Sequence, residues 1–372
     1  MEFYKEKNQR LDIIWNLTSI CPWNCSICCV DAKQVSYSKI TNLITIRDSV
    51  SSFEVPRIGE ENIFNASLKY LQSKKLELTY EEKIKTLDNI DYDNVQIDFS
   101  GGDALIVEEN HKVLEYAAHK IGKENITITL TGNALNQVSP GKLKNLVKEL
   151  NFTYDFPEND EHIRSAGYNF SNLSNAQKFA EIGMNLRAEV PLSTKHKNLN
   201  MLNRIYLDLK NIGVKKLLLM RIFSSGRNAM SNVETLTKSD YYEIITFLKA
   251  LEKKHSFPEV KLQCALKNLY PESLINNPCD AVVNSFGLGW DGLLLASPWA
   301  VKNGGIVLSN KWSLGHLNKN KLSSILNSPK VNDFIQTADN NFGHCKIFAY
   351  TNHCNNRSTN KMLDNSDPLY VD

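Results

Sequence analysis

The sequence predicts an α/β protein, a partial (β/α)6 TIM barrel with a smaller α+β C-terminal cap domain. Short apolar segments rich in β-branched residues alternate with amphipathic segments, which is typical of parallel strands joined by right-handed helical crossovers. Six such strands are fewer than the eight of a closed barrel, so we expect an open sheet. After Arg227 the alternation ends, and the rest of the chain offers short strands, turns and scattered cysteines.

Each expected element has its own local signal. The first strand, Leu11 to Leu17, is mostly apolar and ends at a polar loop. The helix from Pro140 to Leu150 begins with Ser139 and Pro140, a favourable cap and first-turn pair. Further strands are expected at 95–99, 126–130, 151–156, 184–191 and 214–222, and further helices at 108–121, 171–182 and 199–212.

The chain divides into three expected regions. Residues 1–227 form the barrel, interrupted at 32–90 by a polar segment that we expect to be irregular and partly helical. Residues 228–263 hold one amphipathic helix, expected at 239–254, which bridges to the cap domain at 264–372. Because the active sites of α/β barrels lie at the C-terminal ends of the strands, we expect the functional residues there.

Composition argues against several classes of protein. The 372 residues carry a net charge of +2, from 43 Lys and Arg against 41 Asp and Glu, which argues against a nucleic-acid partner. No apolar run reaches the ~18 residues of a membrane span, and Met1 to Arg10 lacks the apolar core of a signal peptide. We therefore expect a cytoplasmic protein, in which clustered cysteines more often hold metal or do chemistry than form disulfides.

Four of the eight cysteines lie between positions 21 and 29, directly after the first strand. At their spacing, the thiolates of Cys21, Cys25 and Cys28 can bind one 4Fe-4S cluster and leave its fourth iron without a protein ligand. An open iron is what a substrate or cofactor needs in order to bind the metal directly. A zinc site is the alternative, but zinc usually takes four ligands, and Cys29 is a poor fourth because adjacent side chains diverge.

The Cys-x3-Cys-x2-Cys pattern of Cys21, Cys25 and Cys28 resembles the signature of the radical S-adenosylmethionine (SAM) superfamily. The resemblance implies one 4Fe-4S cluster whose open iron is chelated by SAM, and reductive cleavage of SAM to methionine and a 5′-deoxyadenosyl radical. It also implies a reducing partner such as flavodoxin or ferredoxin. Ile27 stands where the family usually has an aromatic residue near adenine, which keeps an apolar contact without the ring.

Two motifs after the second and third strands extend the resemblance. Gly101-Gly102-Asp103 resembles the family's Gly-Gly-Glu, which holds the amino group of SAM, although Asp103 is one methylene shorter than Glu. Two glycines at a strand end also let the backbone approach a ligand closely. Thr131 belongs to a Thr-Gly-Asn sequence that resembles the Thr-Asn-Gly often found there. The resemblance thus implies cofactor contacts from these four residues.

Three later motifs carry the resemblance through the rest of the barrel. Thr153 and Asp155 occupy the family's Ser-x-Asp position on the fourth strand. Arg187, on the otherwise apolar fifth strand, has two interpretations: a clamp for the methionine carboxylate, or a member of a structural ion pair. Gly226-Arg227 ends the sixth strand, as a Gly-Arg turn often does in this family.

Residues 264–372 resemble a SPASM domain, an extension that carries two further 4Fe-4S clusters. Its ligand pattern is degenerate, because Ser and Phe replace cysteines, and neither suits an iron–sulfur cluster. By the family's pairing each cluster keeps about two cysteines, so we predict that both auxiliary clusters are absent and that the domain covers the substrate. The matching positions are Cys279, Gly292, Ser297, Cys345, Phe348, Cys354 and Ser358, with Cys264 upstream.

The sequence predicts hydrogen-atom abstraction from a peptide or a small natural product, with peptides favoured. The loss of the auxiliary clusters removes an obvious electron acceptor, which favours epimerisation or rearrangement, or oxidation with another acceptor. Epimerisation requires a hydrogen donor, and the thiol of Cys264 or Cys279 could supply it.

Three other interpretations remain open. An iron–sulfur sensor or scaffold would bind SAM without turning it over. A zinc-binding interaction protein would hold zinc and no iron. A local zinc site on His344, Cys345, His353 and Cys354 would be a legitimate Cys2His2 set. That site is weakened because adjacent side chains point in opposite directions on an extended chain.

Overall fold

The computed structural model contains all six expected barrel strands, in parallel. They are β1 (Leu11–Thr18), β6 (Val95–Gly101), β7 (Ile126–Thr129), β8 (Glu149–Thr153), β9 (Leu186–Leu192) and β10 (Lys216–Arg221). The structure describes residues 9–158, 163–230, 235–270, 279–339 and 345–356, with Asp367 and Leu369. The predicted α/β class with a partial barrel is confirmed.

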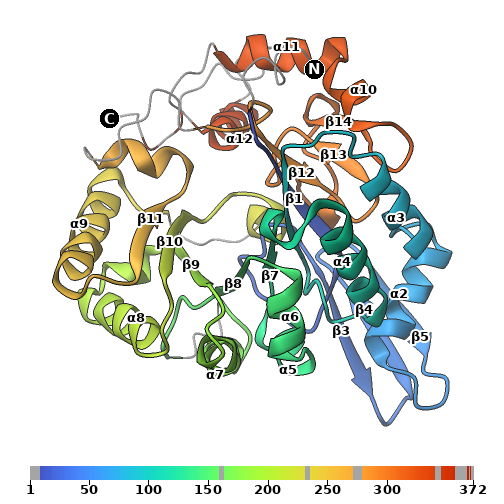
Figure 1. The fold of residues 1–372 in the computed structure, drawn as a ribbon, viewed down its shortest axis with the longest axis horizontal. Coiled ribbons are helices and arrows are strands. Elements are labelled where there is room, and N and C mark those ends of the chain that lie inside the picture. The colour runs from blue at the N-terminus through green and yellow to red at the C-terminus, as the bar shows by residue number, and fades with distance from the viewer. Residues whose placement is uncertain are drawn as a thin grey trace.

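Two further strands extend this sheet beyond the six that the sequence predicted. β11 (Glu259–Leu262) pairs in parallel with β10, and β12 (Ser285–Leu288) pairs in parallel with β1. The sheet continues antiparallel through β13 (Leu293–Leu295) and β14 (Ser313–His316), in the order β11-β10-β9-β8-β7-β6-β1-β12-β13-β14. The sheet is not closed (Figure 1). The cap domain expected at 264–372 therefore shares the sheet of the barrel.

Helices lie along the outer side of the curved sheet (Figure 1). The side chain of Asn198 accepts hydrogen bonds from the backbone N–H groups of Asn200 and Met201, which fixes the start of one of them. The expected helices are present, with α5 in addition, but the helix expected from Pro140 to Leu150 ends at Leu146, because Glu149 and Leu150 belong to β8. They are α4 (Glu108–Ile121), α5 (Gly132–Gln137), α6 (Pro140–Leu146), α7 (Tyr168–Glu181), α8 (Leu199–Asn211) and the bridging α9 (Lys238–His255).

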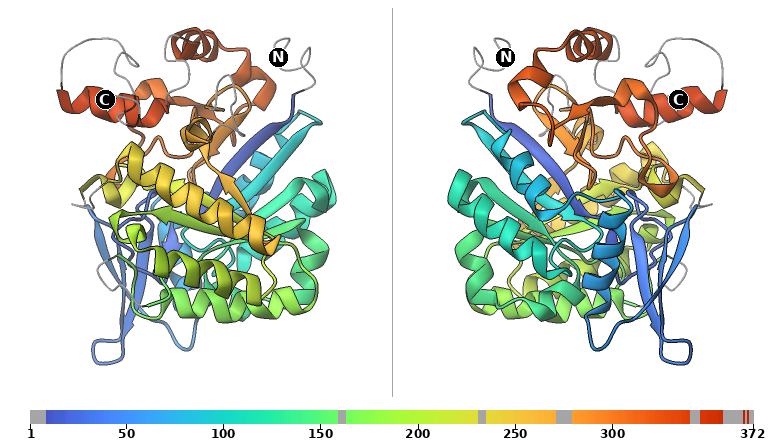
Figure 2. Two further views of the ribbon diagram at one scale, coloured as in Figure 1. Left: turned by 90° about the vertical axis from the view of Figure 1, so that its left-hand side faces the viewer. Right: turned by 90° about the vertical axis from the view of Figure 1, so that its right-hand side faces the viewer.

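The segment 32–90 forms a regular sheet where an irregular segment was expected, whereas its expected helical part is present. A second sheet has the order β2-β3-β4-β5 and is covered by helix α2. Its core joins Ile44 and Ile46 to Leu68 and Leu71 of the helix, and the strands project to one side of the barrel (Figure 2). The elements are β2 (Ile20–Cys21), β3 (Lys33–Ser38), β4 (Leu43–Arg47), β5 (Ser52–Pro56), α2 (Ile63–Ser73) and α3 (Tyr80–Asp88).

One hydrophobic core runs from the barrel into the C-terminal region. Trp15 and Phe99 belong to its barrel part, with ring centroids 5.6 Å apart, and Trp312 and Phe334 belong to its C-terminal part. Three helices complete this region, which lies above the barrel in Figure 2. They are α10 (Leu322–Leu326), α11 (Pro329–Asp339) and α12 (Lys346–Asn356). Among the residues described, none of the helices is long and apolar enough to cross a membrane.

Candidate functional site

A cavity of about 490 Å³ opens where the parallel strands end. Its walls include residues at or near the C-terminal end of each barrel strand, which is where α/β barrels build their active sites. The strand-end residues that border it are Asn16, Ser100, Gly101, Thr129, Thr153, Pro191, Arg221 and Leu262. A cavity therefore lies where the functional site is expected.

The three motif cysteines border this cavity together. Burial raises the pKa of Cys21 well above its ordinary value, and the nearby groups of Asp103, Cys25 and Cys28 raise it further. Burial also raises the pKa of Cys25, whereas the guanidinium of Arg164 lowers it. The three sulfurs are thus close enough to influence one another. This donor set fits an iron–sulfur cluster, whose positive irons stabilise thiolates that burial alone disfavours.

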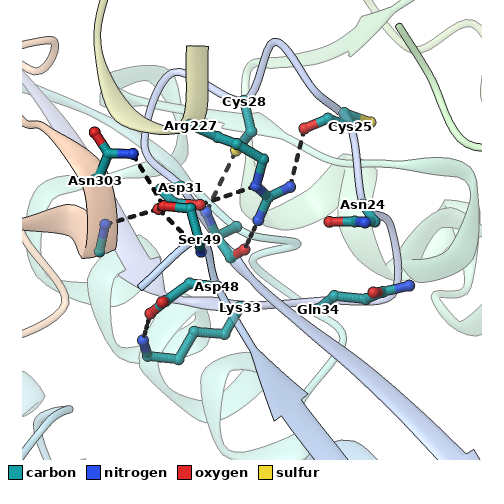
Figure 3. A network of polar contacts seen from close by, with 12 residues as sticks. Asn24, Cys25, Cys28, Asp31, Lys33, Gln34, Asp48, Ser49, Arg227 and Asn303 are labelled. Atoms are coloured by element: carbon teal, nitrogen blue, oxygen red, sulfur yellow. Dashed lines mark hydrogen bonds and ion pairs between the residues drawn. The ribbon is translucent and has the colours of Figure 1, made fainter. Parts of the chain in front are cut away.

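The Gly-Arg turn after β10 clamps the cysteine loop (Figure 3). The backbone N–H of Arg227 donates to the carbonyl of Cys28 at 2.9 Å. Its guanidinium donates to the carbonyls of Cys25 at 2.9 Å and Ala32 at 2.5 Å. A Cβ on Gly226 would come within 2.4 Å of the backbone of Cys29. A glycine is therefore required here because two backbones touch.

Asp31 connects the cysteine loop to two other parts of the chain. Its fully buried carboxylate accepts hydrogen bonds from Nε of Arg227 at 2.9 Å, from the backbone N–H of Gly304 at 2.7 Å, and from the hydroxyl of Ser49. Ser49 follows β4, and Gly304 belongs to the C-terminal region. One carboxylate thus joins the loop, the second sheet and the C-terminal region (Figure 3). No pattern in the sequence around Asp31 indicates this role.

Arg164 is a second residue that sequence reasoning missed. Its Nε and Nη2 donate to Oδ2 of Asp155 at 2.8 and 2.6 Å, and its guanidinium also interacts with Cys25. The guanidinium lies 4.8 Å from the ring centroid of Tyr168. Arg164 borders the cavity, whereas Asp155 is fully buried and is not among the lining residues. Thr153 borders the cavity, so the two residues of the Ser-x-Asp position have separate roles.

The residues of the Gly-Gly-Asp motif also have separate roles. Gly101 and Gly102 border the cavity, and a Cβ on Gly102 would lie 2.1 Å from the carbonyl oxygen of Ile20, so the glycine also permits a close backbone crossing. The carboxylate of Asp103 is fully buried and accepts hydrogen bonds from the backbone N–H groups of Thr131 and Ala134. Burial raises its pKa to about 7. Asp103 thus caps α5 and is not a cavity-lining residue.

Thr131 and Ile27 both border the cavity. The hydroxyl of Thr131 donates to Asp103 at 2.6 Å and accepts from Nε1 of Trp23 at 2.9 Å. Ile27 belongs to a small apolar cluster with Phe156, Ile163 and Ile222. The chain therefore offers an apolar contact at the position where the family usually has an aromatic ring.

Arg187 lies on the cavity wall within a network of carboxylates. Its Nη2 contacts Glu189 at 3.0 Å, and its Nη1 contacts Glu149 at 3.6 Å. Asp98 lies close by, and burial raises its pKa to about 6 although the charge of Arg187 lowers it. The structural ion pair considered for Arg187 is therefore present. Because Arg187 also borders the cavity, the second interpretation, a contact to a bound ligand, stays open.

The C-terminal cysteines gather at the same cavity. Cys264, Cys279 and Cys345 all border it, with Ser297, and Cys264 interacts electrostatically with the other two. The family's pairing led us to expect two cysteines at each auxiliary site, whereas the structure brings three together. The side chain of Cys354 lies outside the described residues, as do Ser358 and both histidines of the alternative zinc site.

Within the described part of the chain, no three His, Cys, Asp or Glu side chains are grouped so as to hold one metal ion. A single ion such as zinc draws all its ligands to one atom. The thiolates of an iron–sulfur cluster each bind a different iron, so their sulfurs lie further apart than the ligands of one ion. Seven cysteines, Cys354 apart, are described with thiols that form no disulfide.

Comparison with solved structures identifies the class of fold. The chain is similar to Streptococcus suis SuiB bound to precursor peptide SuiA, with a TM-score of 0.64 and 11% identity over 99% of this chain and 78% of SuiB. It is also similar to anSMEcpe with bound AdoMet, with a TM-score of 0.57 and 16% identity over 88% of this chain and 84% of the other. The chain has the radical SAM superfamily fold. No family model and no curated protein matches the sequence.

Proposed function

We propose that this protein is a radical SAM enzyme that holds one 4Fe-4S cluster on Cys21, Cys25 and Cys28. With SAM bound at its open iron, such a cluster supplies the electron that cleaves SAM to methionine and a 5′-deoxyadenosyl radical, which abstracts a hydrogen atom from the substrate. The main support is that the three motif cysteines border one cavity, at the C-terminal strand ends of a radical SAM fold. The protein's own part is to hold and orient the cofactor and the substrate and to exclude water from them.

The residues that we assign to SAM are those of the predicted set that border the cavity. The backbone of Gly101 and Gly102 leaves room for a ligand, and Thr131 and Thr153 offer hydroxyl groups. Two further members are Ile27, which faces adenine by resemblance to the family, and Arg187, which we assign to the methionine carboxylate. Asp103 acts indirectly, because its hydrogen bonds orient Thr131.

We further propose a peptide or a small natural product as substrate, with peptides favoured. The similar SuiB structure contains the precursor peptide SuiA, and a similar anSMEcpe structure, with a TM-score of 0.55, contains the Cp18Cys peptide. In this chain the stacked rings of Phe223 and Trp299, with centroids 4.7 Å apart, give the cavity an aromatic wall. Electrons would come from a flavodoxin or ferredoxin, and the compartment would be the cytoplasm.

The C-terminal region acts in this proposal as a SPASM-like cover without auxiliary clusters. It closes one side of the cavity with Ser297, Trp299 and Ile347. Phe348 stands where the SPASM pattern has a cysteine. Cζ of Arg221 lies 3.6 Å from the centroid of its ring, so Phe348 is a structural residue here. A cover without electron acceptors favours outcomes without net oxidation, such as epimerisation or rearrangement.

Anaerobic reconstitution followed by iron and sulfide counting tests this proposal. One cluster gives about four irons per chain, whereas auxiliary clusters in the cap would give about eight or twelve. Reduced protein with SAM should then release 5′-deoxyadenosine. Protein that binds iron and SAM but yields no 5′-deoxyadenosine would be a sensor or scaffold. Zinc without iron would identify a zinc-binding interaction protein.

A further inference from the structure

The chain between β8 and α7 runs beside the cysteine loop and is hydrogen-bonded to it. The backbone N–H of Ser26 donates to the carbonyl of Ile163 at 3.1 Å. The backbone N–H of Asn24 donates to the hydroxyl of Ser165 at 2.9 Å. These two contacts lie on either side of the second motif cysteine in one segment and of Arg164 in the other. The backbone therefore places Arg164 next to that cysteine.

The sulfur of Cys25 accepts hydrogen bonds from two donors of this segment. One donor is the guanidinium of Arg164, and the other is the backbone N–H of Ser165. The sulfur of Cys28, in comparison, accepts a hydrogen bond of 3.4 Å from the backbone N–H of Ala32. Hydrogen bonds from a charged donor are stronger than those between neutral groups. The contact from Arg164 therefore stabilises negative charge on its sulfur more than a backbone contact does.

The guanidinium of Arg164 is held firmly in this position. Nε and Nη2 donate to Oδ2 of Asp155 at 2.8 and 2.6 Å, and the ring centroid of Tyr168 lies 4.8 Å away. The bonds to Asp155 use only part of the N–H donors of a guanidinium, so others remain for the sulfur. Arg164 is only 8% exposed, and its positive charge is permanent because arginine does not lose its proton in proteins.

A fixed cation beside a ligand sulfur has a predictable effect on an iron–sulfur cluster. The reduction potential of such a cluster depends on its net charge, on hydrogen bonds to its sulfurs and on its exposure to solvent. Reduction adds one negative charge, part of which falls on the sulfurs of the ligands. A positive charge and an N–H donor at one of these sulfurs both stabilise the reduced state, and both therefore raise the potential.

We propose that Arg164 raises the reduction potential of the cluster by hydrogen bonding to the sulfur of Cys25. This inference rests on the proposed radical SAM function and deepens it, because it names the residue that favours delivery of the electron. In the step one electron passes from a protein of the flavodoxin or ferredoxin class to the cluster, and Arg164 neither gains nor loses a proton. Arg164 acts through Cys25 and is a positioning residue.

The test measures the midpoint potential of the full chain, reconstituted with its cluster and free of SAM, by redox titration with electron paramagnetic resonance. Arg164→Gln should lower the potential. At one applied potential the ratio of reduced to oxidised cluster should fall roughly tenfold, which is about 59 mV for one electron. Arg164→Lys keeps the charge but lacks the planar fork that serves Asp155 and Cys25 together, so its potential should lie between the other two.

A second variant separates Arg164 from the charge of its partner. Arg164→Gln leaves Asp155 buried without its cation, whereas Arg164→Gln/Asp155→Asn removes both charges and should still have a lower potential than the wild type. The matched control is Arg221→Gln, which should keep the wild-type potential. Arg221 also borders the cavity and forms a buried ion pair, with Asp367, but its thiol neighbour is Cys345 and not a cysteine of the loop.

Several outcomes would overturn the assignment to Arg164. These are an unchanged potential in Arg164→Gln, a wild-type potential restored in the double variant, or an equal fall in Arg221→Gln. Weaker SAM binding at an unchanged potential would show that Arg164 holds SAM instead. Loss of iron and sulfide from every Arg164 variant would make Arg164 a structural part of the loop. Absence of a cluster from the reconstituted wild type would overturn the proposed function itself, and this inference with it.

Discussion

Arg227 donates a hydrogen bond of 2.9 Å from Nε to Oδ1 of Asp31, although 196 positions separate the two residues in the sequence. The pair closes the turn after β10 onto the cysteine loop, which begins at the end of β1. Both side chains are largely buried, with 13% and 0% of their surfaces exposed. The geometry of the loop therefore depends on a strand that lies far away in the sheet.

Replacing Arg227 by alanine should loosen the loop and destabilise the fold. The change leaves the carboxylate of Asp31 buried without its ion partner, and breaking a buried pair in this way costs about 3–5 kcal/mol. Urea denaturation of the metal-free chain measures this loss, and iron retention after reconstitution should fall in parallel. Arg204→Ala is the control, because its ion pair with Glu158 is exposed and contributes below about 1 kcal/mol. Equal effects of the two variants would contradict the clamp.

The four cysteines of the loop should divide into three cluster ligands and one bystander. Single replacements of Cys21, Cys25 or Cys28 by alanine should abolish most of the bound iron, because a cluster with only two protein ligands is not held. Cys29→Ala should keep the iron content of the wild type, although Cys29 also borders the cavity. Iron and sulfide assays after anaerobic reconstitution decide this. Loss of iron in Cys29→Ala would mean that a different trio of thiols binds the cluster.

Sequence reasoning succeeded where the signal was local. The six barrel strands are short segments in which apolar and β-branched residues recur, and the loop of Cys21, Cys25 and Cys28 has a spacing that carries chemical meaning by itself. β11 and β12 were missed because their four residues, Glu-Val-Lys-Leu and Ser-Phe-Gly-Leu, include few β-branched side chains, whereas the equally short β7 reads Ile-Thr-Ile-Thr. The second sheet was missed because most side chains of β3 and β5 stay exposed or half-buried, so the segment looks polar.

The rest of the site depends on contacts between distant residues. Asp31 and Arg164 were missed because their importance comes from their partners, Arg227 and Asp155, and not from a pattern around them. Asp103 matches a motif position, but its carboxylate points to the start of α5. A motif locates a residue in the chain, whereas tertiary contacts decide which atoms face the ligand.

Replacement by alanine should change the stability of the fold in opposite directions at Gly102 and Gly141. A Cβ on Gly102 would lie 2.1 Å from the carbonyl oxygen of Ile20, so Gly102→Ala must move the backbone at the cavity and should cost about 1–3 kcal/mol. Gly141, within α6, has nothing within 4 Å of its added Cβ, and Gly141→Ala should stabilise by roughly 0.5–1 kcal/mol. Thermal denaturation compares the two. A stable Gly102→Ala variant would show that the crossing at Ile20 adapts.

Asp98 gives the fold a pH dependence that a single substitution should remove. Burial raises the pKa of Asp98 from 3.8 to about 6, despite the charge of Arg187 and hydrogen bonds from Thr127 and Thr129 that favour the ionised form. Between these two pH values the folded chain binds more protons than the unfolded chain, so stability falls as the pH rises through this window.

Asp98→Asn should therefore be less pH-sensitive than the wild type. The substitution keeps an oxygen for the hydroxyl of Thr127, which donates to Asp98 at 2.9 Å, but it cannot ionise. The shift corresponds to about 3 kcal/mol, so the free energy of unfolding of the wild type should fall by that order relative to the variant between about pH 4 and 6, and stay level above. Urea denaturation at a series of pH values measures the difference. A difference that grows in favour of the wild type as the pH rises would mean that the carboxylate is stabilised by its neighbours more than burial disfavours it.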